Sequence, residues 1–276
     1  MYVEDWGYRT IREYTTSGVV VRSPLVTFPS GPAGPVGLAL DGAGNIFAGD
    51  GNAGVVRKYT TAGATVNNLF ITGVGHPYEV LCDGNGHLFV ADALNCRVGV
   101  YDTTTGAALN ASLIQWTASP MAMTLDDSGH LFVGFADNTI REYDAATGAP
   151  LASPLISGLN SPRGLAYDGN GHLFVGSWSG GTVGEYTTSG ETVNAALISG
   201  LVNVSDLTFD ANGNLFVADW KTGRISEYTS TGQVINPNVL TLSSHISSVV
   251  IEVPEPSMMT LALLAGVLLF GRRLRT

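Results

Sequence analysis

The sequence predicts an all-β protein, and three observations lead to this prediction. A unit of about 42 residues recurs along most of the chain. Turn dipeptides such as Asp-Gly, Asn-Gly, Ser-Gly and Thr-Gly fall roughly every 8 to 12 residues, the spacing of short antiparallel strands. No segment before the last 24 residues carries a helical apolar period over ten or more residues. Units of this length with four strands each have the size of a β-propeller blade.

Each unit opens with a short strand that ends at an aspartate. The five aspartates are 42, 43, 42 and 42 residues apart: Asp41, Asp83, Asp126, Asp168 and Asp210. The strand before each of them alternates large and small residues, as in Leu38-Ala39-Leu40. After a Gly/Asn turn comes a short apolar run such as His87-Leu88-Phe89-Val90, typical of a strand covered on both faces. A third strand ends at a tyrosine in every unit, so five complete units are visible.

The two ends of the chain predict a sixth blade. Residues 1–18 align without a gap on residues 215–232, so the chain begins inside a blade. Residues 246–252 have the pattern of a first strand, and Glu252 lies 42 residues after Asp210. We therefore expect a six-bladed propeller over residues 1–252, with one blade split between the termini and Val249 buried against Tyr2-Val3.

The repeat resembles a known family. Its pattern is Pro-x-Gly-Leu-Ala-x-Asp-Gly-x-Gly-x-Leu-Phe-Val-Ala-Asp, followed by Arg-Val/Ile-x-x-Tyr. This is similar to the NHL-type propeller repeat and, less closely, to the repeat of streptogramin-lyase-like propellers. The resemblance covers residues 1–252. It implies a binding scaffold in most cases, but the architecture also carries lactonases and lyases, so the fold alone does not give the function.

The tail, residues 253–276, carries a second resemblance. Pro254-Glu255-Pro256 precedes an apolar stretch at residues 258–271, and Arg272 and Arg273 follow it. This order is similar to a PEP-CTERM sorting signal with a short hydrophobic helix, which implies recognition and removal by an exosortase. About fourteen apolar residues fall short of the ~20 that span a bilayer comfortably, yet terminal arginines favour a cytoplasmic end. We expect transient anchoring in the inner membrane before processing.

Export through the main pathway needs a signal peptide, and the first residues are acidic and already resemble a blade strand. We therefore expect that the true start lies upstream and that this chain is truncated at its N-terminus. Without the three arginines of the tail, 10 Lys and Arg face 23 Asp and Glu, so binding to nucleic acid is not expected. Cys82 and Cys96 fall on opposite ends of their strands and are expected to remain unpaired.

The search for catalytic motifs gives little. His87, His130 and His172 share one repeat position, where other units have asparagine, so they are interpreted as turn residues. The sequence contains no nucleophile elbow, metalloprotease helix or phosphate-binding loop. Asp-Gly-Asn-Gly runs have only two of the ligands of a calcium loop, which leaves a divalent cation such as calcium as a weak expectation. No other cofactor or metal site is expected, and no residue is assigned to catalysis.

One group of residues is a candidate ligand-binding face. The loops between second and third strands share one rim of a propeller, and they carry carboxylates, amides and three of the four tryptophans. The candidates are Asp5, Trp6, Asp50, Asn52, Asp92, Asn95, Asp137, Asn138, Trp178, Asp219 and Trp220. Aromatic rings beside polar groups suit a flat polar ligand such as a sugar. The alternative is that the aspartates cap their loops and the tryptophans pack between blades.

Two hypotheses for function follow. The first is an exported cell-surface or extracellular-matrix protein whose propeller is a non-catalytic binding scaffold for a protein or glycan. The second is a propeller lyase or lactonase with a metal-dependent site at the central channel. The second requires acidic, Asn or His residues that converge at the channel mouth, whereas the candidates above are spread around a ring.

Overall fold

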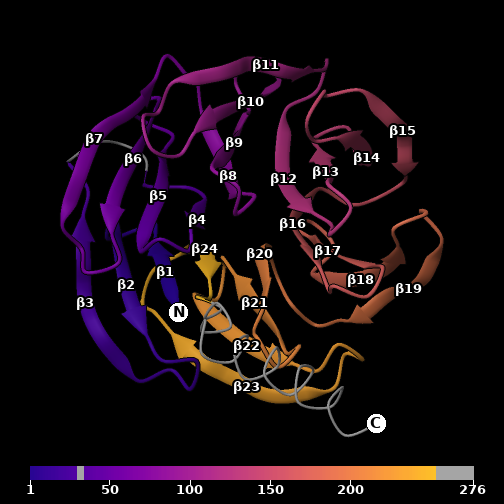
Figure 1. The fold of residues 1–276 in the computed structure, drawn as a ribbon. Helices are drawn as coiled ribbons and strands as arrows, with labels where there is room; N and C mark the ends of the chain where they lie inside the picture. Colours follow the sequence, from indigo (N-terminus) through magenta and orange to yellow (C-terminus); the bar gives the residue numbers. More distant parts are fainter. Residues whose placement is uncertain (30–33, 253–276) are drawn as a thin grey trace, which may run out of the picture.

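The structure is a computed structural model that describes residues 1–29 and 34–252. Its strands form six four-stranded antiparallel sheets, which Figure 1 shows as blades arranged in a ring. The predicted all-β, six-bladed propeller is therefore confirmed. The predicted sorting tail, including its hydrophobic helix, lies outside the described residues. Within the described ranges, no helix is long and apolar enough to cross a membrane.

The strands of each blade are given from the centre of the ring outward. The split blade contains β24 (Ile246–Val250), β1 (Tyr2–Asp5), β2 (Thr10–Tyr14) and β3 (Val20–Thr27). Blade 2 contains β4 (Leu38–Leu40), β5 (Asn45–Asp50), β6 (Val55–Thr60) and β7 (Thr65–Thr72). Blade 3 contains β8 (Pro77–Cys82), β9 (His87–Asp92), β10 (Arg97–Asp102) and β11 (Ala108–Gln115).

The remaining blades repeat this order. Blade 4 contains β12 (Pro120–Leu125), β13 (His130–Phe135), β14 (Thr139–Asp144) and β15 (Pro150–Ile156). Blade 5 contains β16 (Pro162–Tyr167), β17 (His172–Ser177), β18 (Thr182–Thr187) and β19 (Thr192–Ile198). Blade 6 contains β20 (Val204–Phe209), β21 (Leu215–Asp219), β22 (Arg224–Tyr228) and β23 (Val234–Thr241).

The ring closes where the two ends of the chain meet. Strand β24 pairs antiparallel with β1, so Val249 stands opposite Val3, and Figure 1 shows the two strands side by side. Val249 is only 2% exposed, because it packs in the core between the split blade and blade 6. The expected split blade is therefore present, and its innermost strand, β24, comes from the C-terminal end of the propeller.

The core consists of six apolar clusters, one at each junction between neighbouring blades. Each cluster contains the aromatic residue of one second strand. These residues are Tyr2, Phe47, Phe89, Phe132, Phe174 and Phe216, and all are buried. Full burial of such a ring stabilises the fold by roughly 1.5–3 kcal/mol. The repeated Leu-Phe-Val run thus supplies the packing that holds adjacent blades together.

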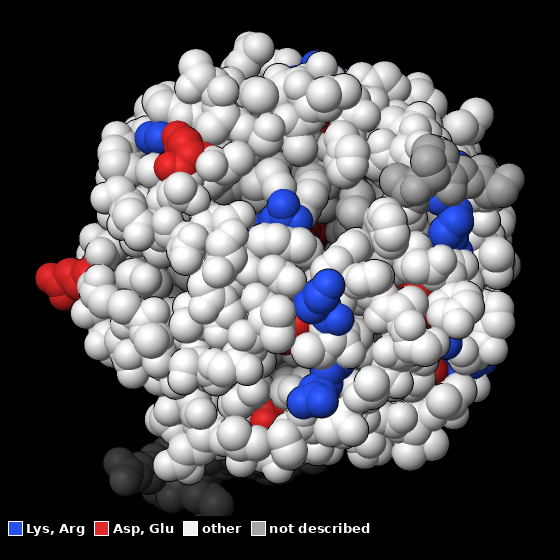
Figure 2. All heavy atoms as spheres, turned by 180° about the vertical axis from the view of Figure 1, so that it is seen from behind, with Lys and Arg blue, Asp and Glu red and all other residues white. Residues whose placement is uncertain are grey.

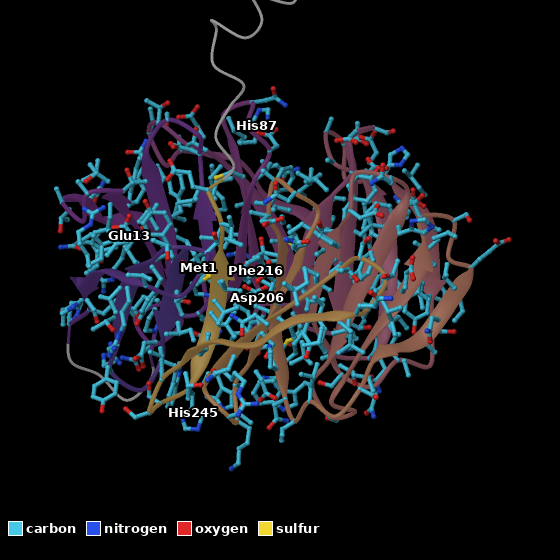
Figure 3. The ribbon with its side chains drawn as sticks, turned by 90° about the horizontal axis from the view of Figure 1, so that it is seen from below. Met1, Glu13, His87, Asp206, Phe216 and His245 are labelled. Atoms are coloured by element: carbon cyan, nitrogen blue, oxygen red, sulfur yellow. The ribbon has the colours of Figure 1, made fainter. Side chains whose placement is uncertain are left out.

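The two faces of the ring carry different turns. His87 and His245 lie at opposite ends of the ring seen edge-on in Figure 3. On the His87 side, the repeat aspartates bind their own turns: Asp83 accepts hydrogen bonds from the backbone of Asn85 and His87, and its Oδ2 lies 2.6 Å from His87 Nδ1. The predicted role of this histidine position in the turns is therefore confirmed. Cys82 and Cys96 are both free, and burial raises the pKa of Cys82 to about 12.

Candidate functional site

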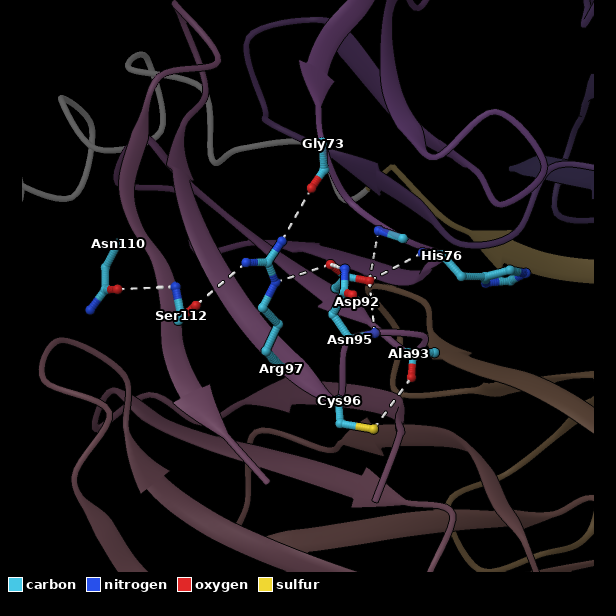
Figure 4. Close-up of polar contacts among 10 residues, drawn as sticks. Gly73, His76, Asp92, Ala93, Asn95, Cys96, Arg97, Asn110 and Ser112 are labelled. Carbon is cyan, nitrogen blue, oxygen red and sulfur yellow. Dashed lines mark hydrogen bonds and ion pairs between the residues drawn. The ribbon is translucent and has the colours of Figure 1, made fainter. Parts of the chain in front are cut away.

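The candidate aspartates at the ends of second strands hold their own loops. Asp92 is 1% exposed, and Figure 4 shows its contacts. Its Oδ1 accepts hydrogen bonds from the backbone of Gly75 and His76, and its Oδ2 accepts from Asn95 Nδ2 at 2.7 Å and Arg97 Nε at 3.0 Å. Burial alone would raise the pKa of Asp92, but these donors together lower it. Its oxygens are therefore occupied within the protein.

The same arrangement recurs around the rim. Asp5 pairs with Arg12 at 2.9 Å, and Asp50 pairs with Arg57 at 2.8 Å. Both carboxylates are buried. Asp219 is also buried, and its oxygens accept hydrogen bonds from four backbone N–H groups of blade 6, the closest being that of Val202 at 2.8 Å. Recurrent aspartates at this position thus stabilise the loops of their blades.

The remaining polar candidates lie on the surface, in blades 2, 3 and 4. Asn52, Asn95 and Asn138 are exposed. Asn138 adopts a positive φ of 66° and accepts a hydrogen bond from the backbone of Ser161. Asp137 pairs with Arg141 at 2.8 Å and accepts a hydrogen bond from Trp116 Nε1. The structure does not bring these side chains together at one point.

The three candidate tryptophans do come together. The Trp220 ring lies 5.1 Å from that of Trp6 and 5.7 Å from that of Trp178, with tilts of 58° and 54°. The His245 ring lies 4.8 Å from Trp220. These residues come from blades 5 and 6 and the split blade, and each is partly exposed. We call Trp6, Trp178, Trp220 and His245 the aromatic cluster.

A cavity of about 270 Å³ adjoins this cluster at the inner end of the loops. It is lined by the three tryptophans and by residues of the innermost strands and their preceding loops: Val36, Gly37, His76, Tyr78, Glu79, Arg163, Ser205 and Ser247. Figure 2 shows this face of the ring, where basic side chains stand beside a central hollow. A second cavity of about 260 Å³ continues between the innermost strands. The aromatic cluster therefore stands at the mouth of the central channel.

A recurrent β-bulge aims residues into this mouth. The register between first and second strands shifts by one residue at the same place in five blades. The residues skipped by the pairing are Tyr78, Met121, Arg163, Ser205 and Ser247. A bulge leaves one residue unpaired and redirects its side chain, and bulges are frequent beside functional sites. Four of these five residues line the cavity.

Arg163 is the charged residue at this mouth. Its guanidinium carbon lies 3.9 Å from the centre of the Trp178 ring and 5.5 Å from that of Tyr78. The His76 ring stacks on Tyr78 at 5.8 Å. Burial raises the pKa of Tyr78 to about 12 and lowers that of His76, so both are uncharged at neutral pH. Two nitrogens, Arg163 Nε and His76 Nδ1, are buried without a hydrogen-bond partner.

Three carboxyls lie along the channel: Glu4 and Asp206 are buried, and Glu79 is partly exposed. Burial raises the pKa of Glu4 and Glu79 well above the ordinary value, and it raises that of Asp206 to about 6. Asp206 accepts hydrogen bonds from Ser248 Oγ at 2.7 Å and the Val249 backbone at 2.8 Å. Glu4 is fully buried, and its Oε1 has no partner. Across residues 1–29 and 34–252, no group of three or more His, Cys, Asp or Glu is arranged to hold a metal ion.

Sequence reasoning found the tryptophans but missed Tyr78, Glu79 and Arg163. A partial signal for Tyr78 and Arg163 exists, because the second residue of the repeat unit ranges from small to aromatic and charged among the six blades. This position holds Val36, Tyr78, Met121, Arg163, Ser205 and Ser247. Glu4 has its own signal, since the equivalent residues of the other five blades are Gly or Ala.

The comparisons with known proteins support the fold. No protein-family model matches the sequence, and no curated protein matches it. A chain in the crystal structure of a nidogen/laminin complex has a TM-score of 0.72 at 14% identity, with 90% of this chain and 95% of that chain covered. A Bacteroides caccae protein of unknown function has a TM-score of 0.69 at 18% identity, covering 90% and 96%. The computationally designed Ika8 protein has a TM-score of 0.59 at 16% identity, covering 88% and 72%.

Proposed function

We propose that this chain is a non-catalytic binding scaffold of the cell surface or extracellular matrix, with its ligand site at the aromatic cluster. The observation that carries the proposal is the convergence of three tryptophans from adjacent blades beside a cavity of about 270 Å³. Partly exposed aromatic rings around a cavity with few polar groups are typical of sites that bind a protein or glycan. The similar chain from a nidogen/laminin complex is consistent with a propeller used for binding.

The surface location rests on the two resemblances of the sequence. An NHL-type repeat is consistent with a scaffold, and a PEP-CTERM tail would direct the chain to an exosortase after transient anchoring through residues 258–271. Export also requires a signal peptide. Substitution of Pro254-Glu255-Pro256 by alanines should leave the protein in the membrane fraction of its host, whereas the unaltered chain should be released after cleavage.

The binding role is tested with Trp220→Ala, which removes the central ring of the aromatic cluster. Trp116→Ala is the matched control, because Trp116 lies on the Arg141 guanidinium in blade 4 and does not line the cavity. We expect Trp220→Ala to weaken binding of a glycan or protein captured by the wild type at least about tenfold, or roughly 1.4 kcal/mol. Equal binding by both variants would place the ligand elsewhere.

A metal-dependent lyase or lactonase is the second candidate, and the carboxyls of Glu4, Glu79 and Asp206 in the channel favour it. Because no three such groups of the described residues are arranged to hold a metal ion, a divalent cation such as calcium would require these carboxyls to move together as well as to lose their protons. The test is incubation of the bound ligand with the protein, with and without a chelator, followed by mass spectrometry. A cleaved product that requires the metal would replace the scaffold proposal.

A further inference from the structure

Arg163 differs from four arginines of the rim in having no carboxylate partner. Arg12, Arg57, Arg97 and Arg141 each pair with an aspartate at 2.8–3.0 Å. No such ion pair is made by Arg163 with any residue in the ranges 1–29 and 34–252. The protein therefore places an unneutralised guanidinium at the mouth of its channel.

The position of Arg163 is fixed by its neighbours. The guanidinium lies between the Trp178 ring at 3.9 Å and the Tyr78 ring at 5.5 Å. Such contacts orient the planar group and reduce the entropy lost when it forms hydrogen bonds. Its Nε is buried without a hydrogen-bond partner, and an unsatisfied buried donor destabilises the protein. A ligand that supplies acceptor oxygens would remove this destabilisation.

The polar neighbour of Arg163 is the hydroxyl of Tyr78, which is uncharged at neutral pH. Glu79 also lines the cavity, where burial raises its pKa well above the ordinary value, and among the described residues it forms no ion pair with Arg163. His76 Nδ1 is a second buried polar atom without a partner in the same cavity. The site thus combines one oriented cation, one unsatisfied imidazole nitrogen and the aromatic cluster.

We propose that the ligand is an acidic glycan, in which the carboxylate of one sugar binds Arg163 and neighbouring sugar rings lie on Trp178 and Trp220. The inference rests on the proposed function and names its ligand class. A guanidinium can bind a carboxylate through two parallel hydrogen bonds, whereas a neutral sugar offers no carboxylate for this paired contact. The three tryptophans that line the cavity have neighbouring ring centres 5.1 and 5.7 Å apart, with Trp220 between the other two, which suits a chain of sugar rings better than the single acidic side chain of a protein.

The test is calorimetric titration of the full chain with oligogalacturonate and with its methyl-esterified form, which has the same rings without the charges. We expect oligogalacturonate to bind at least about tenfold more tightly than the ester. Arg163→Gln should abolish this preference, and Arg163→Lys should restore only part of it. Arg224→Gln is the matched control, because Arg224 is an exposed residue at the start of β22 and does not line the cavity. It should change affinity less than about twofold.

The outcomes separate the inference from the proposed function. In one outcome, the two oligosaccharides bind equally tightly, Trp220→Ala abolishes the binding of both, and Arg163→Gln changes neither affinity. This result would overturn the acidic-glycan inference but would still support the binding scaffold. Failure of both oligosaccharides to bind, with an acidic peptide bound through Arg163 instead, would also overturn the inference and identify a protein ligand. Binding of oligogalacturonate that neither Trp220→Ala nor Arg163→Gln weakens would overturn both proposals.

Discussion

Three blades carry a tryptophan at one rim position, and the other three carry a small residue at the same place. Trp178, Trp220 and Trp6 belong to consecutive blades, while Gly51, Ala93 and Ala136 occupy the equivalent position in blades 2, 3 and 4. The backbone fold of the two halves is the same. This comparison teaches that the repeat fixes the scaffold and that substitution at one loop position decides which half offers a site.

The small residues of blades 2, 3 and 4 also shape the site. A Cβ added at Gly51 would lie 2.5 Å from the His76 ring, so a larger side chain there would force His76 to move. His76 in turn stacks on Tyr78 and lines the cavity. Small residues on this side therefore leave room for side chains that complete the site, whereas the tryptophans on the other side form its wall.

The largest expected effect comes from opening the ring beside the aromatic half. A chain without residues 245–276 loses β24, which contributes the buried Ile246 and Val249 and carries His245 against Trp220. Loss of several buried aliphatic groups costs a few kcal/mol, so we expect the melting temperature to fall by about 10 °C or more, or the chain not to fold. A chain lacking only residues 254–276 is the control, and equal melting temperatures for the two would show that β24 does not close the ring.

A smaller effect concerns pH and the carboxyls beneath the site. The folded-state pKa values of Glu4, Glu79 and Asp206 are raised, so the folded protein binds more protons than the unfolded chain above pH ~4. Their contribution to stability is complete below their ordinary pKa values and is lost as pH rises through the folded values, which for Asp206 means a window from 3.8 to about 6.

The free energy of unfolding should decrease as the pH is raised from about 4 to 7. We expect this decrease to be smaller in Glu79→Gln than in the wild type, because glutamine cannot ionise. Each unit of pKa shift corresponds to about 1.4 kcal/mol. The exposed Glu191 provides the control variant Glu191→Gln. The measurement is chemical denaturation of both variants across this pH range. The expectation would be contradicted if the free energy of unfolding depended on pH equally in both variants and in the wild type.

The smallest expected effect comes from adding a tryptophan to the other half. Ala136 is exposed in blade 4, away from the cavity, so Ala136→Trp should fold normally and change ligand affinity by less than about twofold. Ligand titration of this variant sharpens the comparison. A large gain in affinity would show that any exposed tryptophan on the rim binds the ligand and that the Arg163 cavity is dispensable.

The sequence was sufficient for the architecture because the repeat encodes it several times. Five aspartates at regular spacing, the Leu-Phe-Val runs and the alignment of residues 1–18 on residues 215–232 predicted blade number, blade boundaries and the split blade. Packing between blades uses apolar residues at the same repeat positions, so each copy supports the same conclusion.

The site was only partly predictable. The shared repeat position of the tryptophans indicated one rim, but it did not show that Asp92 and its equivalents turn inward to bind backbone amides and arginines. Arg163 was missed because its role depends on a β-bulge that turns its side chain into the channel mouth, and the variability of its repeat position does not reveal that direction. The unpaired state of Arg163 depends on three-dimensional distances to every carboxylate, which a repeat pattern does not contain.

The central claim is that the ligand binds at the aromatic cluster, and the four tryptophans allow a direct test. Three of them, Trp6, Trp178 and Trp220, line the cavity, and Trp116 does not. NMR spectra of the indole N–H groups of ¹⁵N-tryptophan-labelled protein should be recorded during titration with oligogalacturonate. The account predicts that the three signals from the cavity shift together while that of Trp116 stays in place. A shift of Trp116 without shifts of the other three would contradict it.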